Sequence, residues 1–244
     1  MTGAAARVAG EWPALAALPA PPPARTWRYG PHASQVVDFH GDPAGPRVTV
    51  LHGGYWRQRH DRGYLAATAG ALAAEGYAVA LAEYRRVGGG GRWPEMSADV
   101  AAVVAGAWPD GAAQVLLGHS AGGQLALWAA HRLPERVRGV VAVGPVADLA
   151  LARELGLSDH AVDELLGPDG PLDDADPGRL LPAARPAVLL HGTDDPDVPV
   201  ELSRRYTAAS GAALRELPGT GHFAALTPGS AAFPHLLDAL REFA

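Results

Sequence analysis

Residues 116–123 read Leu-Leu-Gly-His-Ser-Ala-Gly-Gly and connect an apolar strand to a helical stretch. In that stretch Leu125, Trp128 and Ala129 share one face, as expected for a helix that packs on a sheet. A serine between such elements requires a very sharp turn, so the residues two positions away on each side must lack a β-carbon. Gly118 and Gly122 meet this requirement, and the pattern predicts that the hydroxyl of Ser120 is lifted clear of the sheet.

The chain around this motif alternates between apolar runs of strand length and stretches of helical period. Several expected strands are apolar at almost every position, which is typical of a parallel sheet covered on both faces. The alternation predicts an α/β fold with a mostly parallel central sheet and helices on both faces. The expected strands are 36–39, 48–51, 77–82, 115–117, 137–143, 187–190 and 213–217. The expected helices are 63–75, 97–108, 121–132, 200–210 and 231–243, with a shorter one at 159–166.

We expect one domain, because 244 residues with 48% hydrophobic content suffice for one full-sized core. This domain covers residues 35–244, and residues 144–185 form a small cap or lid insertion, because they are too many for a simple connection. Residues 1–34 are expected to be a Pro-rich, extended arm. Prolines in the arm interrupt the apolar stretch that an export signal needs, so a cytoplasmic location is predicted. Because no run of 18 apolar residues occurs, no membrane span is predicted.

The composition excludes several kinds of chemistry. The chain has no cysteine, so disulfides, thiolate metal sites and a cysteine nucleophile are excluded. All 20 basic residues are arginine, which removes the lysine of Schiff bases and of phosphate-binding loops. A net charge of −6 argues against nucleic acid as a partner. No pair of histidines has the spacing of a metal-binding motif, and no metal or other cofactor is expected.

A serine hydroxyl becomes a good nucleophile only when a base within hydrogen-bond reach takes its proton, and that base needs a third group to orient it. In a strand–turn–helix architecture of this kind, the acid and the histidine should follow the serine in that order, each after a later strand. His222 is the predicted base, because no other histidine lies between the predicted acid loop and the last helix. The acid loop contains Asp194, Asp195 and Asp197, and their spacing leaves the choice among them open.

The expected strand 48–51 runs directly into His52-Gly53-Gly54-Tyr55-Trp56-Arg57. The two glycines allow main-chain amides to turn toward the nucleophile and to stabilise a negatively charged oxygen. The predicted oxyanion hole is formed by Gly53, Gly54, Tyr55 and Ala121. The histidines of nearby motifs are expected to have structural roles, namely His40, His52, His60, His119 and His191.

Taken together, these motifs resemble the α/β-hydrolase superfamily, in its esterase branch with a His-Gly-Gly oxyanion loop. The resemblance extends from residue 36 to the C-terminus. In the family's His-Gly-x-x-Asp-x-x-Val-Pro pattern the acid is the aspartate three residues before Val-Pro, which implies Asp195 in this chain. The segment His-Gly-Gly-Tyr-Trp-Arg is similar to that of the arylformamidases, or kynurenine formamidases, which hydrolyse an N-formyl group from an aromatic amine. This likeness implies that Tyr55 or Trp56 lines the substrate pocket.

These observations predict a cofactor-free serine hydrolase that cleaves a small carboxylic ester or activated amide through an acyl-enzyme intermediate. In this prediction Ser120 attacks, His222 transfers the proton and Asp195 orients His222. Two alternatives are a peptidase of the prolyl-oligopeptidase type, which would usually carry a large extra domain, and a non-catalytic binding protein on the same scaffold. The oligomeric state, monomer or homodimer, stays open. Three arginines after the oxyanion loop form either a solvated surface or a site for a substrate carboxylate, namely Arg57, Arg59 and Arg62.

Overall fold

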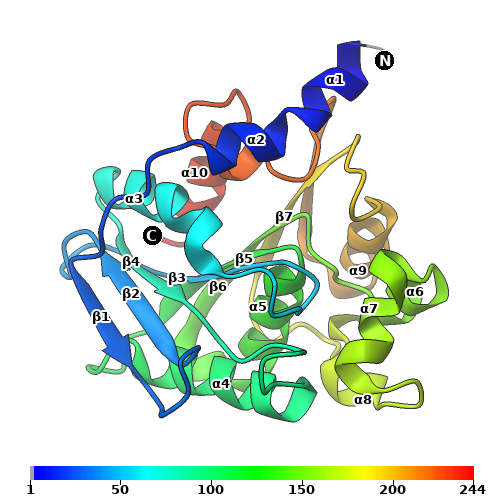
Figure 1. The fold of residues 1–244 in the computed structure, drawn as a ribbon, viewed down its shortest axis with the longest axis horizontal. Helices are drawn as coiled ribbons and strands as arrows, with labels where there is room; N and C mark the ends of the chain where they lie inside the picture. Colours follow the sequence, from blue (N-terminus) through cyan, green and yellow to red (C-terminus); the bar gives the residue numbers. More distant parts are fainter. Residues whose placement is uncertain (1–2) are drawn as a thin grey trace.

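The computed structural model describes residues 3–244, which form one eight-stranded sheet with helices on both faces (Figure 1). The strand order is β1-β2-β4-β3-β5-β6-β7-β8. Strand β2 pairs antiparallel with β1 and β4, and all the other pairings are parallel. The prediction of an α/β fold with a mostly parallel sheet is confirmed.

The strands are β1 (Arg25–Arg28), β2 (Val36–His40), β3 (Arg47–Leu51), β4 (Ala78–Ala82), β5 (Gln114–His119), β6 (Val137–Val143), β7 (Ala187–Gly192) and β8 (Ala213–Leu217). The α-helices are α1 (Gly3–Ala9), α2 (Glu11–Ala16), α3 (Ala66–Ala74), α4 (Trp93–Gly106), α5 (Ala121–Arg132), α6 (Leu149–Glu154), α7 (Leu157–Leu166), α8 (Leu172–Ala175), α9 (Glu201–Ser210) and α10 (Phe233–Arg241). Four short 3-10 helices complete the chain, at Arg62–Leu65, Pro134–Arg136, Pro177–Arg179 and Ala224–Leu226.

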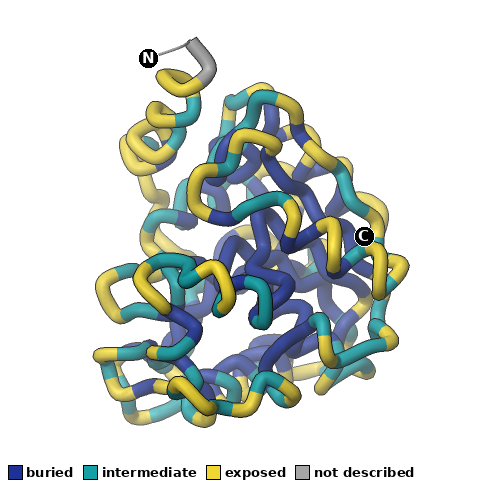
Figure 2. Tube along the Cα trace, turned by 90° about the vertical axis from the view of Figure 1, so that its right-hand side faces the viewer, coloured by how far each residue is buried: buried dark blue, intermediate teal, exposed yellow. Residues whose placement is uncertain are grey.

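The two faces of the sheet pack into two separate hydrophobic cores. Successive residues of the parallel strands point to opposite faces, so Leu116 packs in one core while Val115 and Leu117 pack in the other. Helices α4, α5 and α9 cover the first core, and helices α3 and α10 cover the second. The central strands are buried on both sides, as the dark trace in Figure 2 shows, which explains why their sequences are apolar at almost every position.

The prediction of an extended arm over residues 1–34 is wrong for residues 3–16, which are largely helical, and residues 1 and 2 lie outside the described part of the chain. Helices α1 and α2 cover most of residues 3–16, and residues 25–28 form the edge strand β1. Pro13 does not interrupt α2, because it lies in the first turn, where a backbone N–H has no acceptor within the helix. Leu15 anchors α2 in the second core with 1% of its surface exposed. Tertiary contacts of this kind are not visible in the local sequence.

Residues 144–185 form the helices α6, α7 and α8, which lie together beside α9 (Figure 1). The expected short helix at 159–166 falls within α7 but is regular only from residue 161, because Asp159 and His160 have left-handed φ angles of 52° and 56°. Among the described residues, no helix is both long enough and apolar enough to cross a membrane.

The turn between β5 and α5 depends on two glycines that lie against backbone. A β-carbon on Gly118 would come within 2.3 Å of the carbonyl oxygen of Gly122. A β-carbon on Gly122 would lie 2.1 Å from the carbonyl oxygen of Leu51 at the end of β3. The predicted need for residues without a β-carbon on both sides of Ser120 is therefore confirmed.

We expect Gly122→Ala to destabilise the protein although Gly122 lies in a helix. Helix propensity alone would make alanine more stable than glycine by about 1 kcal/mol, but the new methyl group would force α5 away from β3 at a cost of about 1–3 kcal/mol. Urea denaturation of both proteins measures the difference. An increase of about 1 kcal/mol in the free energy of unfolding would contradict the close backbone approach.

Candidate active site

Ser120 lies at the C-terminal end of β5 in a strained backbone conformation. Its φ of 55° and ψ of −119° are unfavourable for a residue with a β-carbon. Hydrogen bonds hold the backbone there, since Ser120 N–H donates to the carbonyl of Val143 over 2.9 Å and its own carbonyl accepts from Gly123. The hydroxyl thus stands at the edge of the sheet, directly in front of the first turn of α5.

The imidazole of His222 is oriented by Asp195. The distance from His222 Nδ1 to Asp195 Oδ2 is 2.6 Å. A carboxylate can only accept, so Nδ1 carries a proton, and in the neutral form of the ring Nε2 is the acceptor. Gly144, with a φ of 52°, leaves room for this pair, because a β-carbon there would lie 2.9 Å from His222 Nδ1. His222 and Ser120 line the same cavity.

Of the three aspartates in the acid loop, only Asp195 contacts His222 through its carboxylate. Its other oxygen, Oδ1, accepts N–H groups from Asp197 and Val198, both over 2.9 Å. Burial by itself would raise the pKa of Asp195, but hydrogen bonds from His191, His222 and Val198 hold that pKa well below its usual range. The aspartate of this loop that hydrogen-bonds to His222 is therefore Asp195, the one that the family resemblance implies.

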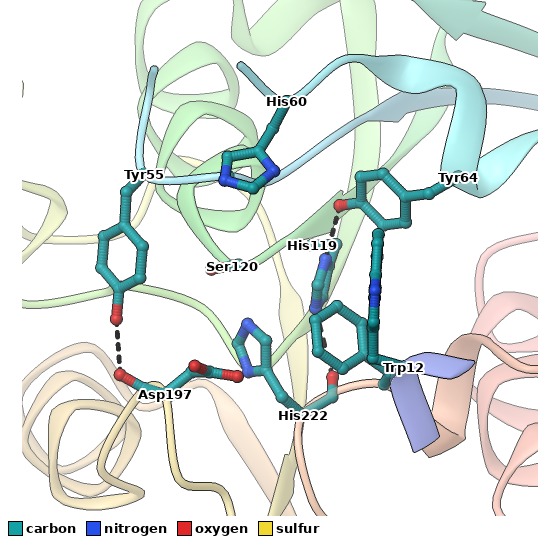
Figure 3. A pocket seen from close by; sticks show the side chains of 10 residues that line it. Trp12, Tyr55, His60, Tyr64, His119, Ser120, Asp197 and His222 are labelled. Atoms are coloured by element: carbon teal, nitrogen blue, oxygen red, sulfur yellow. Dashed lines mark hydrogen bonds between the residues drawn. The ribbon is translucent and has the colours of Figure 1, made fainter. Parts of the chain in front are cut away.

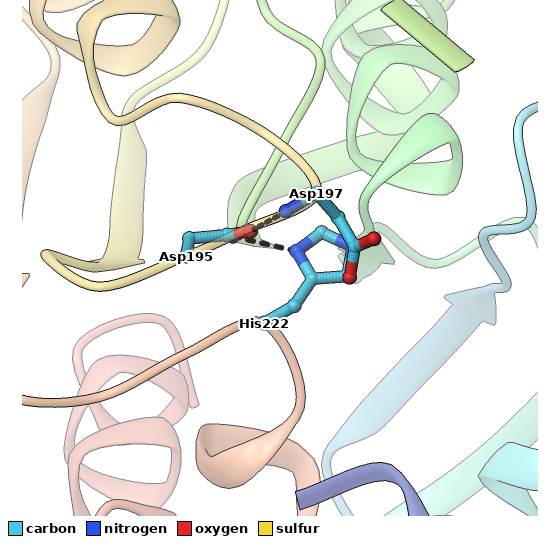
Figure 4. A group of neighbouring side chains, drawn as sticks. All are labelled: Asp195, Asp197 and His222. Atoms are coloured by element: carbon cyan, nitrogen blue, oxygen red, sulfur yellow. Dashed lines mark hydrogen bonds and ion pairs between the residues drawn. The ribbon is translucent and has the colours of Figure 1, made fainter. Parts of the chain in front are cut away.

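Asp195, Asp197 and His222 also bring three possible metal ligands within 4.8 Å of one another (Figure 4). Both oxygens of Asp195 and the Nδ1 atom of His222 are already engaged in hydrogen bonds with each other or with backbone amides. A cation bound by Nδ1 of His222 would have to break the His222–Asp195 hydrogen bond. The grouping thus fits an oriented imidazole better than a metal site.

Of the N–H groups predicted to form the oxyanion hole, that of Gly53 already has a hydrogen-bond acceptor. The N–H of Gly53 donates to the hydroxyl of Tyr64 over 2.7 Å, so it is not available to a substrate oxygen. Its lack of a side chain serves close packing instead, because a β-carbon there would lie 2.8 Å from the β-carbon of Ser120. Gly54 and Tyr55 both line the cavity, with φ angles of 107° and 48°. Ala121, the first residue of α5, has no acceptor for its N–H within the helix.

Tyr64 and His119 connect the oxyanion loop to the loop that carries His222. Tyr64 Oη lies 2.7 Å from His119 Nδ1, and His119 Nε2 lies 3.1 Å from the carbonyl oxygen of His222 (Figure 3). Because a carbonyl only accepts, Nε2 of His119 carries the proton and Nδ1 accepts from Tyr64. Burial and the neighbouring His222 lower the pKa of His119 well below its ordinary value, so its ring is neutral.

A second network of buried side chains surrounds His52, the first residue of the oxyanion loop. His52 Nε2 lies 2.8 Å from Glu83 Oε1, and the guanidinium of Arg86 forms an ion pair with the same carboxylate. The ring of His52 stacks on Tyr84 at a centroid distance of 4.5 Å. Burial and Arg86 lower the pKa of His52 to about 3. These contacts agree with the structural role expected for His52.

A cavity of about 140 Å³ opens onto Ser120. In Figure 3, Tyr55 and Asp197 lie on one side of Ser120, while Trp12 and Tyr64 lie on the other. The walls of the cavity come from several segments of the chain. They consist of Trp12, Gly54, Tyr55, His60, Tyr64, His119, Ser120, Asp197, His222 and Phe223. An engineered cavity of about 150 Å³ is known to hold benzene, so the space suits one ring or a short acyl chain.

Trp56 does not line this cavity, and its predicted contact with substrate is wrong. The side chain is 1% exposed, packs in the first core and donates from Nε1 to Gln124 Oε1 over 3.0 Å. Consecutive positive φ angles at Tyr55 and Trp56 explain the difference, because they turn one ring toward the cavity and the other into the core. Tyr55 does line the cavity, and its hydroxyl donates to the carbonyl of Asp197.

Two arginines of the cluster, Arg57 and Arg62, form ion pairs with residues outside the cavity. Arg57 bonds the carboxylate of Glu164 over 2.6 Å and the carbonyl of Ser158 over 2.6 Å, so it ties the oxyanion loop to α7. Arg62 pairs with Asp38 over 2.7 Å. None of Arg57, Arg59 and Arg62 is among the cavity residues, which argues against a site for a substrate carboxylate at this cluster.

Sequence reasoning missed several residues of the cavity wall. Trp12 lies in the N-terminal segment, which was expected to be an extended arm, and Tyr64 and Phe223 carry no motif of their own. Phe223 follows His222 directly, and this proximity was the one available signal. No residue of the insertion 144–185 lies in the wall, so a lid role for the insertion stays a prediction.

Comparison with known proteins gives one family. The family described as alpha/beta hydrolase fold matches residues 46–176. No curated protein matches the sequence.

Several solved structures are similar over most of their length. An inhibited esterase B from Lactobacillus rhamnosis shares 23% identity with a TM-score of 0.76, covering 98% of this chain and 92% of that chain. A truncated carbohydrate esterase from gut microbiota shares 19% identity with a TM-score of 0.71, and the match covers 91% of this chain and 99% of that chain. The 2-hydroxy-6-oxo-6-phenylhexa-2,4-dienoate hydrolase from Rhodococcus sp. strain RHA1 shares 19% identity with a TM-score of 0.66. The match covers 88% of this chain and 97% of that chain. At these identities the likeness shows a shared fold alone.

The buried neutral histidines predict a loss of stability in acid. Because the pKa of His119 is lowered in the folded protein, the unfolded chain binds a proton first as the pH falls below about 6.5. Each such histidine then reduces the free energy of unfolding by up to about 1.4 kcal/mol per pH unit. We expect His119→Gln to show a shallower decline between pH 6 and pH 4 in urea titrations. An unchanged slope would mean that His119 is protonated in the folded protein.

Proposed function

The chain belongs to the alpha/beta hydrolase fold family, and on that premise we propose that it is a serine hydrolase that cleaves a small carboxylic ester or activated amide. The observation that carries the proposal is the hydrogen bond of 2.6 Å between His222 Nδ1 and Asp195, which leaves Nε2 free in the cavity that contains Ser120. A histidine in this state can accept the proton of a serine hydroxyl.

In the proposed reaction His222 Nε2 takes the proton of Ser120 as its oxygen attacks the substrate carbonyl. The resulting imidazolium is stabilised by Asp195, which stays ionised because its pKa is low. His222 then gives the proton to the leaving oxygen or nitrogen, and an acyl-enzyme on Ser120 remains. Water, deprotonated by the same imidazole, attacks this ester and releases the acid and the serine.

The negative oxygen of the tetrahedral intermediate needs donors that are in place before the reaction. We propose the N–H groups of Gly54, Tyr55 and Ala121 for this role, and we leave out Gly53 because Tyr64 occupies its N–H. The N-terminal end of α5 adds a favourable dipole at the same point. Glycine at position 54 fits the loop, because a β-carbon there would lie 2.3 Å from that of His60.

Two classes of substrate are compatible with this chemistry, namely carboxylic esters and aromatic formamides. The similarity of residues 52–57 to arylformamidases supports the formamide, and the small, largely aromatic cavity accommodates a formyl group beside one ring. We propose an esterase or arylformamidase activity that requires no cofactor and acts on a small molecule.

Ser120→Ala should lower kcat/KM for any substrate by about 10⁴- to 10⁶-fold, because the acyl-enzyme cannot form. Steady-state hydrolysis of p-nitrophenyl acetate measures this loss, and circular dichroism checks that the variant is folded. Retention of more than about a tenth of the wild-type rate would refute the role of Ser120.

Asp195→Asn and Asp197→Asn form a matched pair, because the two residues share one loop. Asp195→Asn should reduce kcat by about 10⁴-fold, since an amide no longer holds the required tautomer of His222. Asp197→Asn should stay within about tenfold of wild type, because its carboxylate does not orient the imidazole. Equal losses in the two variants would show that Asp195 is not the orienting acid.

The formamide reading predicts that N-formylkynurenine is hydrolysed with a kcat/KM at least about tenfold above that of short-chain p-nitrophenyl esters. The two substrates are compared with one enzyme preparation and with Ser120→Ala as the blank. An ester preference would instead identify a general carboxylesterase.

A further inference from the structure

A single carboxylate joins the N-terminal helix α2 to the loop that carries His222. Glu11 Oε1 accepts the N–H of Gly221 over 2.7 Å. Glu11 Oε2 accepts the N–H groups of Phe223 over 2.9 Å and Ala224 over 3.0 Å. The amides on both sides of His222 are therefore held by a residue 210 positions away from Gly221 in the sequence.

The next residue of the same helix, Trp12, forms a wall of the cavity. Its ring centroid lies 5.1 Å from that of Phe223 and 5.7 Å from that of Tyr64, with tilted planes. Although Leu15 on the same helix is fully buried, Trp12 keeps 43% of its surface exposed. A tryptophan that is packed on two aromatic rings but half uncovered at a cavity can gain contact area from a bound ligand.

The position of this wall indicates which part of a substrate it contacts. His222 must deliver a proton to the leaving group, so the leaving group lies on the side of the cavity next to His222. Trp12 packs on Phe223, the residue that follows His222, and lies opposite Tyr55 and Asp197 in Figure 3. The ring of Phe223 also lies edge-on to that of His222 at a centroid distance of 5.0 Å, so Trp12 and Phe223 stand beside the imidazole from which the leaving group receives its proton.

We propose that α2 is the specificity element of this active site: Trp12, with Tyr64 and Phe223, binds an aryl leaving group, and Glu11 fastens the helix to the His222 loop. The inference rests on the proposed role of Ser120 as the nucleophile. Its two residues on α2, Glu11 and Trp12, lie outside the segment 46–176 that matches the family, and the proposal assigns to the N-terminal segment the selectivity that a lid in residues 144–185 would otherwise supply.

The test compares two acetates that differ only in the leaving group, phenyl acetate and 2,2,2-trifluoroethyl acetate. Trp12→Ala should lower kcat/KM for phenyl acetate about tenfold, mainly through KM, and change the alkyl ester less than about twofold. Trp12→Phe should restore most of the aryl preference. Leu155→Ala is the matched control, since Leu155 is a similarly exposed apolar side chain on the insertion, and it should change neither rate.

Glu11→Ala should reduce the aryl preference as Trp12→Ala does, because α2 loses its attachment. It should also lower kcat for both esters, because the loop of His222 loses three hydrogen bonds. Glu154→Ala, which removes an exposed glutamate of α6, is the control and should leave both esters unchanged. A Glu11→Ala protein with normal kcat and normal aryl preference would overturn the fastening role.

A binding measurement separates this inference from the hydrolase proposal. In the Ser120→Ala background, acetanilide binding is followed by calorimetry with Trp12 intact and with Trp12→Ala, and about tenfold weaker binding is expected without the indole. Equal binding, an equal kinetic loss for both esters, or a change of preference in Leu155→Ala would overturn the specificity role. If wild type hydrolyses neither ester but the binding difference persists, the hydrolase proposal fails and the aryl site stands.

Discussion

The backbone at Ser120 is the constraint on which the site depends. A residue with a β-carbon is held at a φ of 55° because β5 and α5 meet there almost without separation. Gly118 and Gly122 allow this approach, and Gly53 brings the oxyanion loop to within van der Waals contact of the serine. Strain of this kind persists only when the surrounding structure fixes it, and here three adjacent parallel strands do so.

Around this turn, the loops at the carboxyl edge of the sheet are connected by hydrogen bonds. Tyr64 and His119 link Gly53 to the backbone of His222, and Tyr55 links the oxyanion loop to the carbonyl of Asp197. Because the histidine at position 119 is neutral, the connection adds no charge beside His222. The geometry of the reacting groups is therefore set by polar contacts between loops that come from distant parts of the sequence.

Much of the fold could be predicted because its signals are local. The apolar strands and the pattern Gly-His-Ser-Ala-Gly can each be recognised from a few consecutive residues. The predicted bounds of the strand 137–143 and of the helix 121–132 are those of β6 and α5 in the structure. The start of α4 at residue 93 also has a local signal in the sequence, because the carboxylate of Glu95 accepts the N–H of Arg92 at the beginning of the helix.

The parts that could not be predicted depend on contacts between distant residues. Helix α2 is short and contains a proline, and its position depends on Leu15 in the core and Glu11 at the histidine loop. Trp56 was assigned to the pocket because sequence order does not reveal the positive φ that turns its ring inward. The engagement of the Gly53 amide by Tyr64 is likewise a contact between separate elements.

The central claim is that Ser120 is a nucleophile activated by His222. The most direct measurement is mass spectrometry of the protein after reaction with a fluorophosphonate, followed by peptide mapping. The account predicts one adduct per chain, located on Ser120, and its absence when His222 is replaced by alanine. No adduct on the wild-type protein, or an adduct at another residue, would contradict it.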